Sequence, residues 1–218
     1  MACLQVSRTE PTSRPATFCA LRLGPERTIE VVSVFAWSRL DVHVGLGWAR
    51  FEADDSIRVE GHEVIVDAGV SWVVAFEVQL DEGWQSRRAE VVVHGDHGSR
   101  ELVLESDGNG NWQVNGSPAP ELRGCLDVDI AATPSTNTFV IRRLGLPVGR
   151  IGEVRVVWVS IPALEVAAVE QSYTHLEPRN GIDRYEYRSR GSIDGWVIEV
   201  DEDGVALDYE GFARRLHP

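Results

Sequence analysis

The chain has 218 residues, of which 43% are hydrophobic and 25% are charged, a composition typical of a globular protein with a sizeable core. Its formal net charge is -13 at pH 7, and the acidic residues are spread over the whole length. Such a chain repels phosphate backbones, so we expect no nucleic-acid partner.

The N-terminus and the cysteines indicate a protein of a reducing compartment. The first residues lack the basic start and apolar core of a secretory signal, and no uncharged run reaches the length of a membrane span. Cys3, Cys19 and Cys125 are widely spaced without a C-x-x-C pair, which argues against a disulfide framework or a zinc module. We therefore expect a cytoplasmic protein with no transmembrane segment.

Residues 1–36 are expected to be a lead-in to one domain of residues 37–218. Prolines stand among polar residues in the first part of this lead-in, although Phe18 to Leu23 could add an edge strand. We find no internal repeat, low-complexity tract or linker that divides the rest.

From Ile29 onward the chain becomes a series of short extended runs. Ile29 to Trp37 is strongly apolar, and the turn signals that follow it are spaced by roughly ten residues. They are Gly45–Gly47, Asp54–Asp55, Glu60–Gly61, Asp67–Gly69, Asp81–Gly83, Gly95–Gly98, Asp107–Asn111 and Asn115–Gly116. This spacing predicts an antiparallel barrel, roll or sandwich.

The C-terminal half carries the same signals. Apolar and polar residues alternate along 196–201 and 205–210, and Asp201–Gly204 is the expected hairpin turn between them. Val154 to Ile161 is apolar on both faces, which predicts a central strand covered on both sides. Helical periodicity is weak, with at most one turn at 210–216, so we expect an all-β fold.

Residues 124–144 are read as strand, loop, strand. Cys125, Asp127 and Asp129 alternate with apolar residues, so both aspartates should point to one face of a strand. A cluster of turn formers at 133–138 contains Pro134, and an extended run resumes at 139–141.

The two aspartates could work as acid and base on a sugar or lipid head group. Two like charges about 7 Å apart on one strand face favour a raised pKa in one of them, as acid catalysis needs. Alternatively, Asp127 and Asp129 face water or pair with Arg142 or Arg143 as strand-end ion pairs.

The two arginines end the expected second strand. Adjacent residues on a strand point to opposite faces, so only one of Arg142 and Arg143 could enter a cavity. There it could hold a phosphate, a sulfate or a sugar hydroxyl. In the alternative interpretation, both arginines are strand-end charges that face water.

Aromatic residues are the remaining candidates for a site. Seven tryptophans could line a groove for lipid chains or stack on sugar rings, although most of them are expected in the core. The cavity-lining candidates are Trp158, Tyr173, Tyr185 and Tyr187. His94 and His97 in a glycine-flanked hairpin tip lack a third ligand, so we expect neither a metal nor a cofactor.

Several segments, in order, resemble one protein family. The central one reads Gly-Cys-Leu-Asp-Val-Asp at 124–129, Pro-Ser-Thr-Asn-Thr at 134–138 and Ile-Arg-Arg-Leu at 141–144. It closely resembles the central signature of the putative glycolipid-binding family of bacterial proteins. Other matching segments are Trp37–Leu40, Asp81–Trp84, Arg87–Arg88, Leu104–Gly108, Trp112, Ile161–Pro162, Gln171–Tyr173, Tyr185–Tyr187, Val200–Gly204 and Asp208–Tyr209.

The resemblance covers residues 37–216 and implies a fold and a ligand. The fold would be a many-stranded antiparallel sheet rolled into an incomplete barrel around an apolar cavity, similar in shape to bacterial lipoprotein carriers. The ligand would be a glycolipid or another lipid. No catalytic residue is carried over from the family.

Three hypotheses follow for function. In the first, a carrier or sensor grips the polar head of an amphipathic lipid with Asp127, Asp129, Asn137 and one of the two arginines, while Trp158 and Tyr173 line the cavity. In the second, a hydrolase uses the two aspartates. In the third, the acids and arginines form a buried structural network. Edge strands of an open roll would also permit a homodimer.

Overall fold

The computed structural model describes residues 32–53, 56–96, 98–192 and 194–216, so the expected edge strand at 18–23, Cys3, Cys19 and His97 lie outside the described residues. Within them, fifteen strands form one sheet in the order β8-β7-β6-β5-β4-β3-β2-β1-β15-β14-β13-β12-β11-β10-β9. The first strands are β1 (Val32–Arg39), β2 (Val44–Ala53), β3 (Ile57–Asp67), β4 (Val70–Leu80), β5 (Ser86–Gly95), β6 (Gly98–Ser106), β7 (Trp112–Val114) and β8 (Ser117–Pro118). The others are β9 (Asp127–Ile130), β10 (Ile151–Val159), β11 (Val166–Arg179), β12 (Ile182–Ser189), β13 (Trp196–Val200), β14 (Ala206–Tyr209) and β15 (Ala213–Arg215).

The strands form where apolar and polar residues alternate, and the chain turns between strands where the sequence has glycine or aspartate. Ala68 and Gly69 take positive φ in the tight turn between β3 and β4. The Asp81 carboxylate accepts the backbone N–H groups of Gly83 and Gln85 in the turn between β4 and β5. Asp201 accepts the N–H groups of Asp203 and Val205, which confirms the expected hairpin turn there.

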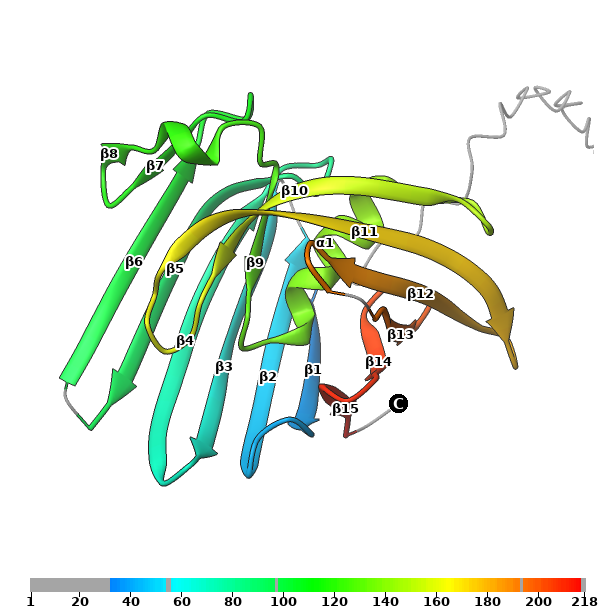
Figure 1. Cartoon of the computed structure of the whole chain (residues 1–218), viewed down its shortest axis with the longest axis horizontal. Helices are drawn as coiled ribbons and strands as arrows, with labels where there is room; N and C mark the ends of the chain where they lie inside the picture. The colour runs from blue at the N-terminus through cyan, green and yellow to red at the C-terminus, as the bar shows by residue number, and fades with distance from the viewer. Residues whose placement is uncertain (1–31, 54–55, 97, 193, 217–218) are drawn as a thin grey trace, which may run out of the picture.

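The sheet rolls up without closing, and all its pairings are antiparallel except that of β9 with β10. In Figure 1, β9, β10 and the helix α1 (Asn137–Leu144) cross in front of the sheet formed by β1–β6. The end strand β9 comes close to β5, where Ser86 donates its N–H to the Leu126 carbonyl and accepts the N–H of Val128. The expected all-β roll in the shape of an incomplete barrel is therefore confirmed.

Two apolar clusters fill the roll, and β10 and α1 lie between them. Val157 and Val159 of β10 pack with the inner face of β1–β6, whereas Val154 and Val156 pack with the tyrosines of β11–β14. The expectation of a strand covered on both sides is confirmed for β10. The Trp37 indole donates to the Ala206 carbonyl at 2.8 Å, which joins the first strand to the last hairpin.

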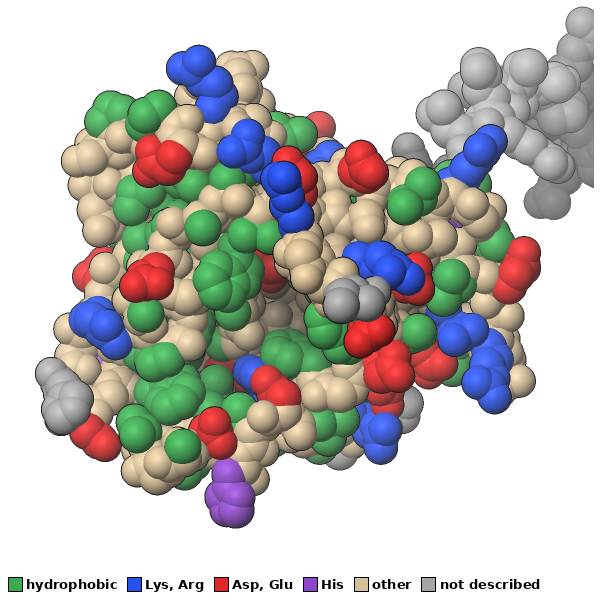
Figure 2. Space-filling view, in the orientation of Figure 1, with side chains coloured by type: hydrophobic (Ala, Val, Ile, Leu, Met, Phe, Trp, Pro, Cys, Tyr) green, Lys and Arg blue, Asp and Glu red, His purple; other side chains and the backbone are tan. Residues whose placement is uncertain are grey.

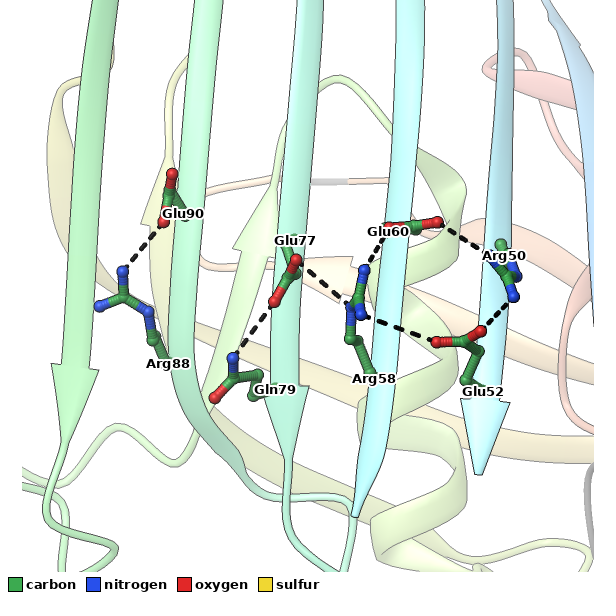
Figure 3. Close-up of polar contacts among 8 residues, drawn as sticks. All are labelled: Arg50, Glu52, Arg58, Glu60, Glu77, Gln79, Arg88 and Glu90. Carbon is green, nitrogen blue, oxygen red and sulfur yellow. Dashed lines mark hydrogen bonds and ion pairs between the residues drawn. The ribbon is translucent and has the colours of Figure 1, made fainter. Parts of the chain in front are cut away.

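The outer face of β2–β5 carries a ladder of alternating charges (Figure 3). Arg58 contacts Glu60 at 2.6 Å and Glu77 at 3.3 Å, and its side chain is 42% exposed. Arg88 contacts Glu90 at 2.9 Å. These pairs are solvated and lie on the face of the sheet away from α1. They therefore keep that face hydrated, and they do not line the interior of the roll.

The expected second strand at 139–144 is wrong, because these residues belong to α1. Thr133 caps a short 3-10 helix, η2 (Pro134–Thr136), by accepting the N–H of Ser135, and Pro134 suits its first position. α1 follows and ends at Gly145, whose φ of 49° closes it in the left-handed conformation. The two arginines therefore lie in the last turn of a helix, where the helix dipole favours positive charge.

Two turn signals and the expected terminal helical turn are also wrong. Gly45–Gly47 lies within β2, and Glu60–Gly61 lies within β3. The three glycines in these segments face other side chains: a Cβ on Gly61 would lie 2.5 Å from the Phe76 ring, and Gly45 and Gly47 lie against Arg39 and Glu63. Residues 213–215 form β15, which pairs with β1. In the described part of the chain, no helix is both long and apolar enough to cross a membrane.

Candidate functional site

A pocket of about 530 Å³ opens between β10–β14 and the connection that follows β1. Its walls are mainly aromatic: Trp158, Tyr187, Trp196, Tyr209 and Phe212. Four of these side chains come from the inner face of neighbouring strands and Phe212 comes from the connection after β14, which explains why they converge on one space. We call this space the aromatic pocket. Its volume lies within the usual range of small-molecule sites.

The rings of the pocket contact one another in a continuous run. Tyr187 lies 6.0 Å from both Trp196 and Tyr209, measured between ring centroids. Tyr209 lies 4.9 Å from Phe212. Behind this wall, Tyr173 lies 5.3 Å from Tyr187. Because packed rings hold each other in place, the pocket has a rigid apolar surface.

Charged groups also line the pocket. Asp41, Arg190 and Glu210 line it together with the rings. The Arg190 side chain is 73% exposed and contacts Glu170 at 3.0 Å. Two acids and one outward arginine therefore favour a neutral, hydroxyl-bearing ligand over an anionic one.

Arg39 fixes two of these pocket residues. Its guanidinium donates to both carboxylate oxygens of Asp41 at 2.8 and 2.7 Å, and it also donates to the Ala132 carbonyl. The same group lies 4.1 Å above the centre of the Phe212 ring. Since Arg39 is buried, it positions Asp41 and Phe212 from behind the pocket.

The aspartates of the signature are engaged in buried polar contacts. Arg143 holds Asp127 through two hydrogen bonds of 2.8 and 2.6 Å, and Asp127 is fully buried. Asp129 accepts hydrogen bonds from Gln171 at 2.6 Å and from Thr136 at 3.1 Å. Burial raises the pKa of both carboxyl groups, and these hydrogen bonds oppose the increase.

Tyr173 and Asn137 extend this network. The Tyr173 hydroxyl donates to the Asn137 side-chain carbonyl at 2.9 Å, and the Gln171 side-chain carbonyl lies 3.4 Å from it. Asn137 in turn donates to the Pro134 carbonyl. The network therefore ties β9 and β11 to the start of α1, one layer behind the pocket.

The structure separates the seven predicted site residues into three places. Asp127, Asp129, Asn137, Arg143 and Tyr173 belong to the buried network, and Trp158 lines the aromatic pocket. Arg142 lies 4.8 Å from the ring centre of Trp84 and contacts Asp203 at 3.9 Å. Of the other aromatic candidates, Tyr187 lines the pocket and Tyr185 is buried against His175.

Sequence reasoning missed the pocket residues Asp41, Tyr209 and Phe212. Tyr209 carries a signal, since it alternates with acidic residues at the end of the last expected strand. Asp41 and Phe212 lie in connections, and only the pairing of β1 with β15 brings them together. At the hairpin tip, His94 contacts the Ser99 hydroxyl, and no group of three metal-ligating residues occurs among the described residues.

Comparisons with known proteins identify a family and similar structures. Residues 34–215 match the family model described as "Putative glycolipid-binding". A crystal structure of a DUF1089 family protein from Pseudomonas aeruginosa is 36% identical, with a TM-score of 0.70 over 78% of this chain and 92% of that chain. A beta-barrel-like DUF1849 protein from Brucella abortus is 9% identical over 84% of this chain and 93% of that chain, with a TM-score of 0.46. No curated protein matches the chain.

Proposed function

Because the chain belongs to the putative glycolipid-binding family, we propose that it binds a glycolipid in the aromatic pocket, as a cytoplasmic carrier or sensor. The observation that supports this most is the run of four contacting rings, Tyr187, Trp196, Tyr209 and Phe212, which lines the pocket together with Trp158 and charged residues. Aromatic faces stack on the apolar face of a sugar ring and also contact acyl chains.

The size of the pocket limits what enters it. A volume of about 530 Å³ suits one or two sugar rings or part of one acyl chain, and is small for a whole two-chain glycolipid. We infer that the pocket holds the sugar and the adjoining part of the lipid. Figure 2 shows that hydrophobic side chains gather around a recess on the concave face, which offers further apolar surface outside the pocket.

The head group is expected to be neutral. Asp41 and Glu210 supply carboxylate oxygens that accept hydrogen bonds from sugar hydroxyls, whereas a phosphate would be repelled by Glu210, since Arg39 balances the charge of Asp41. The buried signature network supports the pocket wall from behind through Tyr173.

The hydrolase hypothesis draws no support from the geometry. Arg143 occupies both carboxylate oxygens of Asp127, while Gln171 and Thr136 occupy those of Asp129. Neither aspartate lines the aromatic pocket. A general acid or base must reach the substrate, so we favour binding over catalysis.

Titration with n-dodecyl β-D-maltoside below its micelle concentration tests the proposal, with calorimetry as the readout. Trp158→Ala should weaken binding at least tenfold, because it removes one wall of the pocket. Trp48→Ala is the matched control, since Trp48 stacks on His62 of the outer face at 5.2 Å. Dodecyl sulfate should bind more weakly than the maltoside. Absence of maltoside binding, or equal effects of the two substitutions, would contradict the proposal.

A further inference from the structure

One buried acid takes no part in the signature network. Glu63 lies in the middle of β3 on the inner face of the sheet, and it is fully buried. No hydrogen bond of ordinary distance and angle reaches either of its carboxyl oxygens among the described residues, although the Thr133 hydroxyl lies near them. Buried acids without a partner are rare, because an ionised carboxylate is poorly solvated inside a protein.

The neighbouring strand makes room for this side chain. Gly47 of β2 is the cross-strand partner of Glu63, and a Cβ at position 47 would lie 2.0 Å from the Glu63 carboxylate. Gly45 makes the corresponding room for Arg39, whose Cβ would lie 2.4 Å from an added Cβ. The two glycines of Gly45-Leu-Gly47 therefore leave space on the inner face of the sheet for the basic Arg39 and the acidic Glu63.

The charged groups that act on Glu63 come from two elements. Arg39 of β1 attracts its carboxylate form, and Asp41 in the connection after β1 repels it. The Thr133 hydroxyl, which contacts Ser135, also favours the carboxylate form. Burial outweighs these attractions and raises the pKa of Glu63 to about 8. At neutral pH most molecules therefore carry an uncharged Glu63 beside an Arg39–Asp41 ion pair.

We propose that Glu63 is a proton-linked positioning residue for the aromatic pocket, acting through Arg39 on Asp41 and Phe212. This inference rests on the proposed function of the pocket. When Glu63 is protonated, Asp41 is the carboxylate that pairs with the Arg39 guanidinium, and the Phe212 ring packs against the same guanidinium. When Glu63 loses its proton to solvent, a second carboxylate competes for the same guanidinium.

The expected result is weaker binding at alkaline pH. Arginine keeps its charge, so the competition draws the Arg39 guanidinium toward Glu63 and away from its two pocket neighbours. Asp41 and Phe212 then lose the contact that orders them at the edge of the pocket. A ligand must then order Asp41 and Phe212 when it binds, and the entropy lost in doing so lowers its affinity.

Titration of dodecyl maltoside from pH 6.5 to 9.5 tests the inference, with Glu63→Gln as the variant that stays neutral. The wild type should lose at least fivefold in affinity with a midpoint near pH 8, and Glu63→Gln should keep its affinity throughout. Glu63→Leu, with the same neutral charge, should behave like Glu63→Gln and serves if the glutamine variant folds poorly. Wild-type binding that does not change with pH would overturn the inference, as would an unchanged pH dependence in the variants.

A separate measurement distinguishes failure of this inference from failure of the proposed function. If the wild type binds no dodecyl maltoside at any pH, the proposed function fails. Proton linkage at Glu63 is then read from the protein alone, as a melting temperature that falls with pH in the wild type and not in Glu63→Gln. Parallel melting curves of the two proteins would overturn the inference in that case as well.

Discussion

Arg143 in the last turn of α1 holds Asp127 of β9 through two parallel hydrogen bonds, of 2.8 Å from Nε and 2.6 Å from Nη2. The aspartate is fully buried, and the arginine side chain is 18% exposed. The pair joins the only helix longer than one turn in the described residues to the end strand of the sheet. Buried bidentate pairs of this kind tolerate the loss of both partners better than the loss of one.

Asp127→Ala should therefore lower the free energy of unfolding by about 3 kcal/mol, because it leaves the partly buried Arg143 guanidinium without its carboxylate partner. Asp127→Leu combined with Arg143→Met should recover most of that loss. Urea denaturation of the two single variants and the double variant measures this coupling. A loss in the double variant equal to the sum of the two single losses would show that the pair contributes nothing beyond its separate side chains.

Tyr173→Phe should destabilise the protein by about 1–3 kcal/mol, because it leaves the buried Asn137 carbonyl oxygen without its donor. Affinity for dodecyl maltoside should stay within twofold of the wild type, since Tyr173 lies behind Tyr187 and does not line the pocket. Denaturation and calorimetry on the same preparation separate the two effects. A large loss of affinity without loss of stability would place the Tyr173 hydroxyl in ligand contact instead.

Arg58→Ala on the outer ladder should change the free energy of unfolding by less than about 1 kcal/mol, because its ion pairs are solvated. The side chain is 42% exposed and contacts Glu60 and Glu77. The small difference should shrink further in 1 M sodium chloride. A loss as large as that of Asp127→Ala would mean that the ladder acts as a cooperative network.

The strands could be predicted because their signals are local. Alternation in 196–200 and the aspartate turn at 201–204 depend on neighbours within a few residues, and both form as expected. The helix α1 was missed for a local reason as well. Strands are favoured by the β-branched residues Val140 and Ile141 and by the threonines around Asn137. Helix boundaries are nevertheless marked by Thr133 and Pro134 at the start of the helical segment and by Gly145 at its end. Tertiary packing decides the conflict, since a helix lets the adjacent Val140 and Ile141 both contact one apolar cluster while Phe139 contacts the other.

The aromatic pocket could not be predicted from the sequence. Asp41 and Phe212 are far apart in the chain and meet only because β15 pairs with β1. The alternation of Glu63 with Val59 and Ile65 does place it on the apolar face of its strand, but Glu60–Gly61 also matches a turn signal, which divides this strand. One signal is present, since two glycines at 45 and 47 interrupt an apolar run, although the same pair also predicts a turn. Glycines inside a strand also mark a close approach of other side chains, as they do here.

The raised pKa of Glu63 predicts that stability falls with rising pH. The unfolded chain releases this proton near pH 4.5, whereas the folded chain holds it until about pH 8. Between these values the folded state binds more protons, so each pH unit lowers the free energy of unfolding, by on the order of 3–5 kcal/mol in all. Urea denaturation from pH 4.5 to 9 should show a wild-type curve that declines relative to Glu63→Gln and becomes parallel above pH 8. A constant difference would exclude titration of Glu63 in this window.

Gly47→Ala tests whether Glu63 needs the space that its cross-strand partner leaves. The added Cβ would lie 2.0–2.2 Å from the carboxyl atoms, so the side chain must move within a packed core, at a cost of about 1–3 kcal/mol. Gly95→Ala in β5 is the matched control, because its Cβ would meet its nearest neighbour at an ordinary 3.7 Å. In a Glu63→Ala background the cost of Gly47→Ala should largely disappear, since the clashing atoms are gone. If the cost persists there, it comes from the β2 backbone, and Gly47 is then required for a reason other than Glu63.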